Sequence, residues 1–274
     1  MPFLFVVLYG LFSGFFDVLP VSSSAHQAVF QNLFGVNGPM HLYHLFIHLA
    51  SLSALILASM PSITALLREQ RILSQPRKRM QGDRKFTYEL RFVKTAAISA
   101  AVFTALMMLV GGFSNNLLVM GIFCVVNGAI VLVPEYLPYG NKTAKHMNRL
   151  DASVFGLVSG LSAFSGVSRI ATMQFYGSMR GADRTKVCNW ALLATIPALV
   201  VLSLVDLFGL FTDGAGTVTF LTFLSYLFGA ALSFVGTFSG VTFLRFLSAK
   251  IGFTGFGYYS IGAGIFTFFL YLTV

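Results

Sequence analysis

Residues 17–26 read Asp-Val-Leu-Pro-Val-Ser-Ser-Ser-Ala-His and interrupt an apolar stretch that covers residues 2–38. A second apolar stretch, residues 152–182, is interrupted at residues 162–172 by Ser-Ala-Phe-Ser-Gly-Val-Ser-Arg-Ile-Ala-Thr. Each interruption carries a helix breaker, a proline in the first and a glycine in the second. A helix-loop-helix hairpin that enters and leaves a membrane by the same face explains this pattern. Non-helical backbone at membrane depth is tolerated only where protein or a watery cavity surrounds it.

The composition requires lipid as the solvent for much of the chain. Hydrophobic residues make up 56% of its 274 residues and charged residues only 10%, whereas roughly a quarter of a soluble domain is charged. Six further stretches are apolar over the ~20 residues that a membrane span needs. The sequence therefore predicts an all-α polytopic membrane protein with six transmembrane helices and two re-entrant helix-loop-helix hairpins. The six stretches are residues 41–60, 93–113, 117–137, 187–208, 219–243 and 254–273.

The two interrupted stretches resemble each other. Residues 10–14, Gly-Leu-Phe-Ser-Gly, align with residues 156–160, Gly-Leu-Val-Ser-Gly, and the same displacement places Ser22 on Ser168. Three spans follow each interrupted stretch, and an odd number of spans would insert the second copy upside down. Inverted repeats with broken helices are a recurring transporter architecture. We therefore expect an inverted repeat whose halves are residues 1–140 and 141–274.

The basic residues predict the orientation. If the loop at residues 61–92 is cytoplasmic, alternation makes the basic segments 138–151, 180–186 and 244–253 cytoplasmic too, and no external segment carries Lys or Arg. Such a bias marks the cytoplasmic side, so the net charge of +9 does not indicate nucleic-acid binding. We expect a plasma-membrane protein whose first hairpin opens to the outside. The first loop carries Arg68, Arg71, Arg77, Lys78, Arg79, Arg84 and Lys85.

Arg169 lies deep in apolar sequence, where insertion of an arginine costs about 2.5–3.5 kcal/mol. One interpretation is an ion pair with Asp17 that locks the two halves together. The other is that Arg169 binds an anionic headgroup, because a guanidinium matches phosphate oxygens with a fork of donors. The hydroxyl-rich surroundings favour the second interpretation. The candidate phosphate-binding serines are Ser22, Ser24, Ser165 and Ser168, with Ser23 and Ser162 beside them.

The serines at residues 22–24 precede a predicted helix. A helix start with free N–H groups is an anion site by geometry and dipole; simple N-capping is the alternative, although it needs one serine rather than three. His26 follows Ser23 by one helical turn, so a hydroxyl and its base could meet. A hydroxyl nucleophile with an oriented base is the general pattern of covalent catalysis, and Asp17 could orient or charge-balance His26.

His41, His44 and His48 share one face of the first predicted span. A zinc site is conceivable, but no acid or thiol clusters with these histidines in the sequence. We therefore favour polar packing against the first hairpin, with His44 and His48 lining the cavity.

At these motifs the chain resembles the undecaprenyl pyrophosphate phosphatase family of the bacitracin-resistance type. The family's Leu-Pro-Val-Ser-Ser-Thr-Gly-His is similar to residues 19–26, and its Pro-Gly-x-Ser-Arg-Ser-Gly is similar to residues 165–171. The resemblance implies removal of the terminal phosphate from polyprenyl diphosphate on the outer side, which recycles the lipid carrier of cell-wall peptidoglycan synthesis. It further implies that Ser23 is the nucleophile, that His26 is its base or acid, and that Arg169 grips the diphosphate.

The chain also departs from the family pattern. The family's first glutamate is Ser13 here, its second is shortened to Asp17, and a Glu and a Gln on the next span are His44 and His48. Family members usually need a divalent cation such as Mg or Ca, and the loss of a carboxylate weakens such a site. Ser13, His44 and His48 are therefore supporting candidates only.

Two alternatives to the phosphatase remain open from the sequence. A polyprenyl-phosphate transporter or flippase would use the same site without hydrolysis, and a non-catalytic membrane scaffold would not need the site. The expected partners are the lipid and the bilayer but no nucleic acid, and a homodimer is compatible with this prediction.

Overall fold

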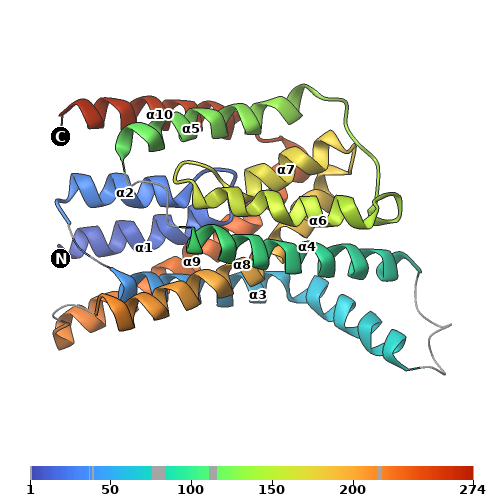
Figure 1. Cartoon of the computed structure of the whole chain (residues 1–274), viewed down its shortest axis with the longest axis horizontal. Helices are drawn as coiled ribbons and strands as arrows, with labels where there is room; N and C mark the ends of the chain where they lie inside the picture. Colours follow the sequence, from blue (N-terminus) through green and yellow to red (C-terminus); the bar gives the residue numbers. More distant parts are fainter. Residues whose placement is uncertain are drawn as a thin grey trace.

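The computed structural model describes residues 2–36, 38, 40–75, 84–110, 116–214 and 218–273, without the side chains of residues 84 and 85. Within these residues, six helices are long and apolar enough to cross a membrane, which confirms the six predicted spans. The helices run roughly along the long axis of the molecule, and both termini lie at one end (Figure 1). The six are α3 (His41–Ser74), α4 (Arg84–Leu109), α5 (Leu117–Leu132), α8 (Arg184–Thr212), α9 (Phe220–Lys250) and α10 (Thr254–Thr273).

Several spanning helices are longer than predicted. α3 continues through Pro61 to Ser74 and α4 begins at Arg84, so most of the expected loop at residues 61–92 is helical. The apolar pattern reports the part of a helix that lipid covers, and a helix can continue beyond it. Here the hydroxyl of Thr87 donates a 2.6 Å hydrogen bond to the carboxylate of Glu69 and joins the two extensions. The basic residues expected at 77–79 lie outside the described residues, as do the side chains of residues 84 and 85.

The two interrupted stretches each form a pair of short helices. In the first pair, α1 (Phe3–Asp17) and α2 (Ser23–Leu33) are separated by residues 18–22, and we call these residues together with Ser23 the first tip. In the second pair, α6 (Arg149–Leu157) continues as a 3-10 helix, η4 (Val158–Ala163), and is separated from α7 (Arg169–Met179) by residues 164–168. We call these residues together with Arg169 the second tip. Two short 3-10 helices, η2 (Val133–Tyr136) and η3 (Ala144–His146), connect α5 to the second pair.

Local signals set where these helices begin. α6 starts earlier than the predicted residue 152, because Asn148 and Asp151 form a reciprocal capping box there. The side chains of Ser22 and Ser168 cap α2 and α7 by accepting hydrogen bonds from backbone N–H groups three residues on. Gly166 in the second tip has a φ of 118°, a backbone conformation that residues other than glycine rarely adopt.

Paired small residues hold the short helices against the long ones. A Cβ atom added to Gly10 of α1 would overlap the backbone of Gly229 in α9, and one added to Gly156 of α6 would overlap the Ala96 carbonyl of α4. Small residues that allow backbones to approach are typical of helix packing in membranes. The glycines that recur in the two stretches therefore have a packing role.

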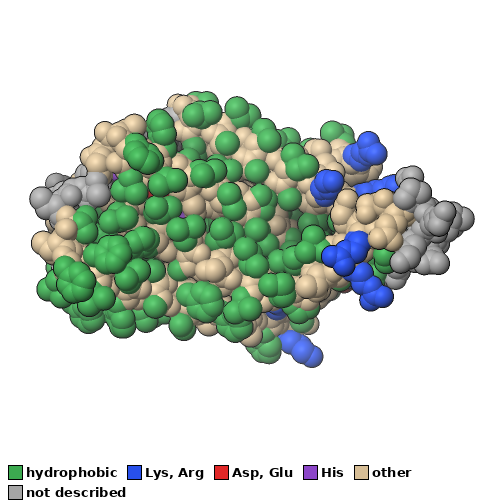
Figure 2. Space-filling view, turned by 90° about the horizontal axis from the view of Figure 1, so that it is seen from below, with side chains coloured by type: hydrophobic (Ala, Val, Ile, Leu, Met, Phe, Trp, Pro, Cys, Tyr) green, Lys and Arg blue, Asp and Glu red, His purple; other side chains and the backbone are tan. Residues whose placement is uncertain are grey.

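The surface is divided in the manner of a membrane protein. Apolar side chains cover most of the face in Figure 2, and Lys and Arg side chains gather at the end where α3 finishes. Lipid can cover the apolar zone, and the basic end marks one membrane interface.

Candidate active site

The two tips meet in the interior of the helix bundle. The hydroxyl of Ser22 accepts a 3.0 Å hydrogen bond from the backbone N–H of Gly166, and the hydroxyl of Ser168 donates a 2.9 Å bond to the carbonyl of Leu19. The serines that cap α2 and α7 thus connect segments that are almost 150 residues apart in the sequence.

Asn127 of α5 connects the tips further, and sequence reasoning missed it. Its side-chain oxygen accepts a 2.8 Å hydrogen bond from the N–H of Ser168, and its nitrogen donates at 3.1 Å to the carbonyl of Pro20. Asn127 is fully buried, so these bonds satisfy groups that would otherwise be costly to bury. An amide within the predicted apolar span 117–137 was the available signal.

A cavity of about 120 Å³ lies beside the joined tips. Gln27 of α2 and His48 of α3 contribute to its wall in addition to residues of both tips. The structure therefore brings the principal predicted residues of the two interrupted stretches to one small space. The predicted residues that line it are Asp17, Ser23, Ser24, His48, Ser162, Ser168 and Arg169, whereas His44, which was also expected to line it, does not.

Charge in the cavity is concentrated on Asp17 and Arg169, both less than one-tenth exposed. One carboxylate oxygen of Asp17 accepts hydrogen bonds from the Ser23 hydroxyl at 3.1 Å and from Arg169 Nη2 at 3.3 Å. The other oxygen, Oδ2, and Arg169 Nη1 are buried and have no hydrogen-bond partner among the described residues. Burying polar groups without partners is costly. The ion pair, which was the less favoured of the two interpretations, exists, and it leaves Nη1 of Arg169 able to donate to a further group.

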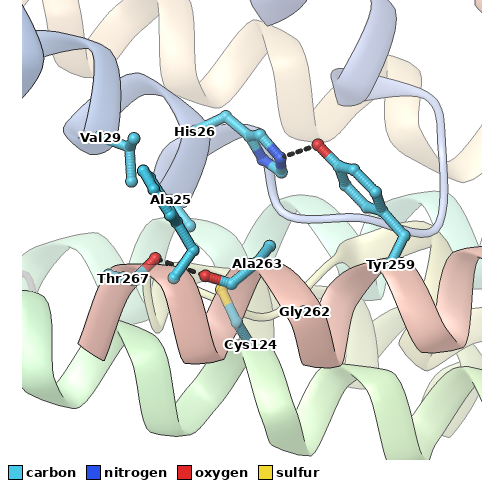
Figure 3. Close-up of a pocket in the computed structure, with 9 residues that line it drawn as sticks. Ala25, His26, Val29, Cys124, Tyr259, Gly262, Ala263 and Thr267 are labelled. Atoms are coloured by element: carbon cyan, nitrogen blue, oxygen red, sulfur yellow. Dashed lines mark hydrogen bonds between the residues drawn. The ribbon is translucent and has the colours of Figure 1, made fainter. Parts of the chain in front are cut away.

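The ring of His26 is not hydrogen-bonded to Ser23, although the sequence led us to expect this bond. Its Nδ1 donates a 2.6 Å hydrogen bond to the carbonyl of Ser22, and its Nε2 accepts one from the hydroxyl of Tyr259 in α10 at 2.8 Å. Figure 3 shows the ring pointing from α2 toward α10, on the side of an apolar groove of about 400 Å³. The hydroxyl of Ser23 is hydrogen-bonded to Asp17 instead.

The remaining predicted serines differ in their access to the cavity. Ser24 lines it and shares a 3.0 Å hydrogen bond with Ser22. Ser13 is buried and reaches it only through Gln27, whose amide donates to Ser13 at 3.1 Å. Ser165 is partly buried but does not line this cavity.

Two acids, Asp206 of α8 and Asp213 directly after α8, cluster with the histidines of α3, which corrects the expectation that no acid would do so. Asp206 lies 2.6 Å from Nδ1 of His48 and 3.9 Å from Nδ1 of both His41 and His44, and Asp213 lies 3.0 Å from Nε2 of His41. The acids are remote in sequence, and only the packing of α3 against α8 brings them in. Asp206 was the one acid in the predicted span 187–208, and an intramembrane acid is a functional candidate by default.

The side chains of the cavity do not fit a resident divalent cation. Mg and Ca take several oxygen ligands, usually including carboxylates, and the cavity offers one carboxylate, Asp17, that already neutralises Arg169. Among the described residues, no three His, Cys, Asp or Glu side chains are placed to hold a metal ion, and this applies equally to zinc at His41, His44 and His48.

The fold and the cavity together define a multi-pass membrane protein with a buried arginine, a carboxylate and hydroxyl groups around one small polar space. The family model described as Bacitracin resistance protein BacA matches residues 6–266, and the chain belongs to this family. The resemblance seen at two motifs is thereby confirmed over nearly the whole chain.

Curated relatives align along almost their full length. The undecaprenyl-diphosphatase of Halothermothrix orenii is 23% identical over 95% of each chain. That of Alkaliphilus metalliredigens is 26% identical over 89% of this chain and 90% of the relative. Undecaprenyl-diphosphatase 2 of Halalkalibacterium halodurans is 23% identical over 99% of this chain and 97% of the relative. The chain is thus a divergent member of the family.

Proposed function

We propose that this protein is a membrane phosphatase that converts undecaprenyl diphosphate to undecaprenyl monophosphate and phosphate. The observation that carries the proposal is Nη1 of Arg169, which has no hydrogen-bond partner among the described residues and is buried at a cavity that Ser23 also lines. The names of the curated relatives support hydrolysis and not the transporter alternative.

In the proposed mechanism, Ser23 Oγ attacks the terminal phosphorus of the substrate. The bond from this phosphorus to the bridging oxygen breaks, and undecaprenyl monophosphate leaves. The Arg169 guanidinium and the backbone N–H groups at the start of α2 stabilise the charge of the transition state. Water then attacks the phosphoserine, which releases phosphate and restores the serine.

Asp17 has two roles in this proposal. Its hydrogen bond from Ser23 orients the nucleophile, and its ion pair keeps Arg169 at the cavity when no substrate is bound. The sequence assigns the proton transfers to His26. That role requires the imidazole ring to leave the carbonyl of Ser22 and the hydroxyl of Tyr259.

We further propose that the two helix pairs are re-entrant hairpins of an inverted repeat in the plasma membrane. The exchange of packing partners supports this proposal: α1 packs on α9 as α6 packs on α4, and α3 packs on α9 as α8 packs on α4. With the basic end in the cytoplasm, the first hairpin opens to the outside and places the cavity within reach of a substrate on that side.

Phosphate release from undecaprenyl or farnesyl diphosphate by the purified protein in detergent tests the proposed activity. We expect turnover by the wild-type protein. A protein that releases no phosphate, yet moves labelled polyprenyl phosphate across proteoliposome membranes, would contradict the phosphatase and establish the transporter.

The same assay with a chelator tests the cation. A resident catalytic metal supplies several kcal/mol, so its removal would slow the reaction by more than about 100-fold. Because Asp17 is the one carboxylate among the described residues that line the cavity, we expect the chelator to change the rate by less than about 10-fold. A loss that only an added divalent ion restores would show that a cation joins the site.

A further inference from the structure

His48 lines the cavity and is hydrogen-bonded to Asp206, which lies behind it and is not among the lining residues. Both side chains are mostly buried, and the carboxylate lies 2.6 Å from the ring Nδ1. Because Asp206 occupies Nδ1, the ring nitrogen that has no hydrogen-bond partner among the described residues is Nε2. His48 lines the same cavity as Ser23, Asp17 and Arg169.

A carboxylate bonded to one ring nitrogen fixes the tautomer of a histidine. The proton then resides on Nδ1, and the lone pair on Nε2 is free to accept a proton. This is the relation of an orienting group to a general base. His26 differs, since hydrogen bonds to Ser22 and Tyr259 occupy both of its ring nitrogens.

We propose that His48, held in position by Asp206, is the general base and acid of the reaction. This inference rests on the proposed phosphatase activity and moves the proton-transfer role from His26 to His48. His48 is the catalytic residue in this scheme, and Asp206 is a positioning residue that acts through it.

The proton transfers balance with water as the only further reactant. His48 Nε2 takes the proton of Ser23 Oγ while the new O–P bond forms and the bond to the bridging oxygen breaks. The departing monophosphate takes this proton from the imidazolium. In the second step Nε2 takes a proton from the attacking water, and Ser23 Oγ receives it as the phosphoserine bond breaks.

Several ionisable groups surround the pair and contribute to its pH dependence. From α3 itself, His44 has its ring centre 6.3 Å from that of His48, and His41 lies 3.9 Å from Asp206. Asp17 of α1 and Arg169 of α7 share the cavity with His48. Two further groups are Tyr9 of α1, which is bonded to His44, and Asp213, which is bonded to His41.

His48→Gln tests the catalytic role. General acid–base catalysis contributes about 100- to 10,000-fold, so we expect kcat to fall by that factor with KM changed by less than about three-fold. The acid limb of the pH–rate profile, where protonation of the base stops the reaction, should flatten. His26→Gln should reduce kcat by less than about 10-fold. The matched control is His146→Gln, because His146 is exposed on η3, and it should leave the rate unchanged.

Asp206→Asn tests the positioning role. We expect a fall in kcat of about 10- to 100-fold, a displaced acid limb, and partial rescue by Asp206→Glu, which a purely structural role would not produce. The double variant His48→Gln, Asp206→Asn removes both members of the buried pair, so that neither group is left buried without its partner. It therefore controls for loss of activity by misfolding. Its rate should equal that of His48→Gln, because the two residues act as a unit.

Two results would overturn the assignment in different ways. If the wild-type protein is active and folded His48→Gln retains its rate and pH profile, His48 is not the base, while the phosphatase proposal stands. If the wild-type protein releases no phosphate from either diphosphate, both proposals fall.

Discussion

The two tips share a scaffold and differ in chemistry. Ser22 and Ser168 occupy equivalent positions, cap the helices that follow, and bond to the opposite tip. The next residue differs: α2 begins with the hydroxyl of Ser23 and α7 with the guanidinium of Arg169. Both side chains donate to the same oxygen of Asp17. In the proposed mechanism, the residue that both halves retain builds the structure, and the residue that diverged supplies the chemistry.

Replacement of the diverged residue in the first tip should have the largest effect. Ser23→Ala removes the proposed nucleophile, so we expect phosphate release to fall by more than about 1,000-fold. Ser165→Ala is the matched control, because Ser165 belongs to the second tip but does not line the cavity. A Ser23→Ala protein with the rate of the control would break the comparison.

Replacement of the diverged residue in the second tip should have the next largest effect. Arg169→Lys keeps the charge but loses the planar fork that matches phosphate, and we expect kcat/KM to fall by about 100-fold. Steady-state phosphate release at several substrate concentrations measures it. If kcat/KM stays at the wild-type value, Arg169 serves only the ion pair with Asp17.

Replacement of a retained residue should affect stability more than catalysis. Ser168→Ala removes the cap of α7 and the bond to Leu19, and we expect the free energy of unfolding to fall by about 1–2 kcal/mol. Thermal unfolding in detergent measures this loss. The comparison would be contradicted by a Ser168→Ala protein that is as stable as wild type but as inactive as Ser23→Ala.

The smallest expected effect concerns Asp151, where the second helix pair begins. Burial opposes its ionisation, but the backbone N–H of Asn148 and the Arg180 side chain outweigh burial and lower the pKa of Asp151. An aspartate whose pKa is lowered on folding stabilises the folded protein at pH values above its ordinary pKa of 3.8. This stabilisation is lost as the pH falls below 3.8 and through the lowered pKa of the folded state. Thermal unfolding should therefore show Asp151→Asn to be less stable than wild type at pH 7, with the difference shrinking toward pH 3. An equal difference at both values would contradict this assignment.

Apolar length and the polar interruptions were sufficient to predict the six spans and the two helix pairs. The helix ends were less predictable, because α3 extends to Ser74 through a contact between Glu69 and Thr87 that apolar length does not report. Helix capping explains a second error in the predicted boundaries, since the capping box formed by Asn148 and Asp151 starts α6 before the apolar stretch begins.

The site was predictable where it depends on the position of a residue in the chain. It was unpredictable where it depends on the rotation of a side chain or on the packing of two distant helices. The motifs were sufficient to place Asp17, Ser23 and Arg169 together. The spacing of His26 and Ser23 could not reveal that the His26 ring turns to Tyr259, which is 233 residues away. Asp206 was visible as a lone acid in an apolar span, but its contact with His48 depends on the packing of α3 against α8.

The most direct test of the claim that both tips build one phosphate site is a search for the phosphoserine. The protein would be mixed with undecaprenyl diphosphate, quenched in acid within a single turnover, digested and analysed by mass spectrometry. We expect a phosphoryl group on Ser23 in the wild-type protein and much less of it in Arg169→Lys. Turnover without any modified Ser23, or a phosphoryl group on another residue, would contradict the account.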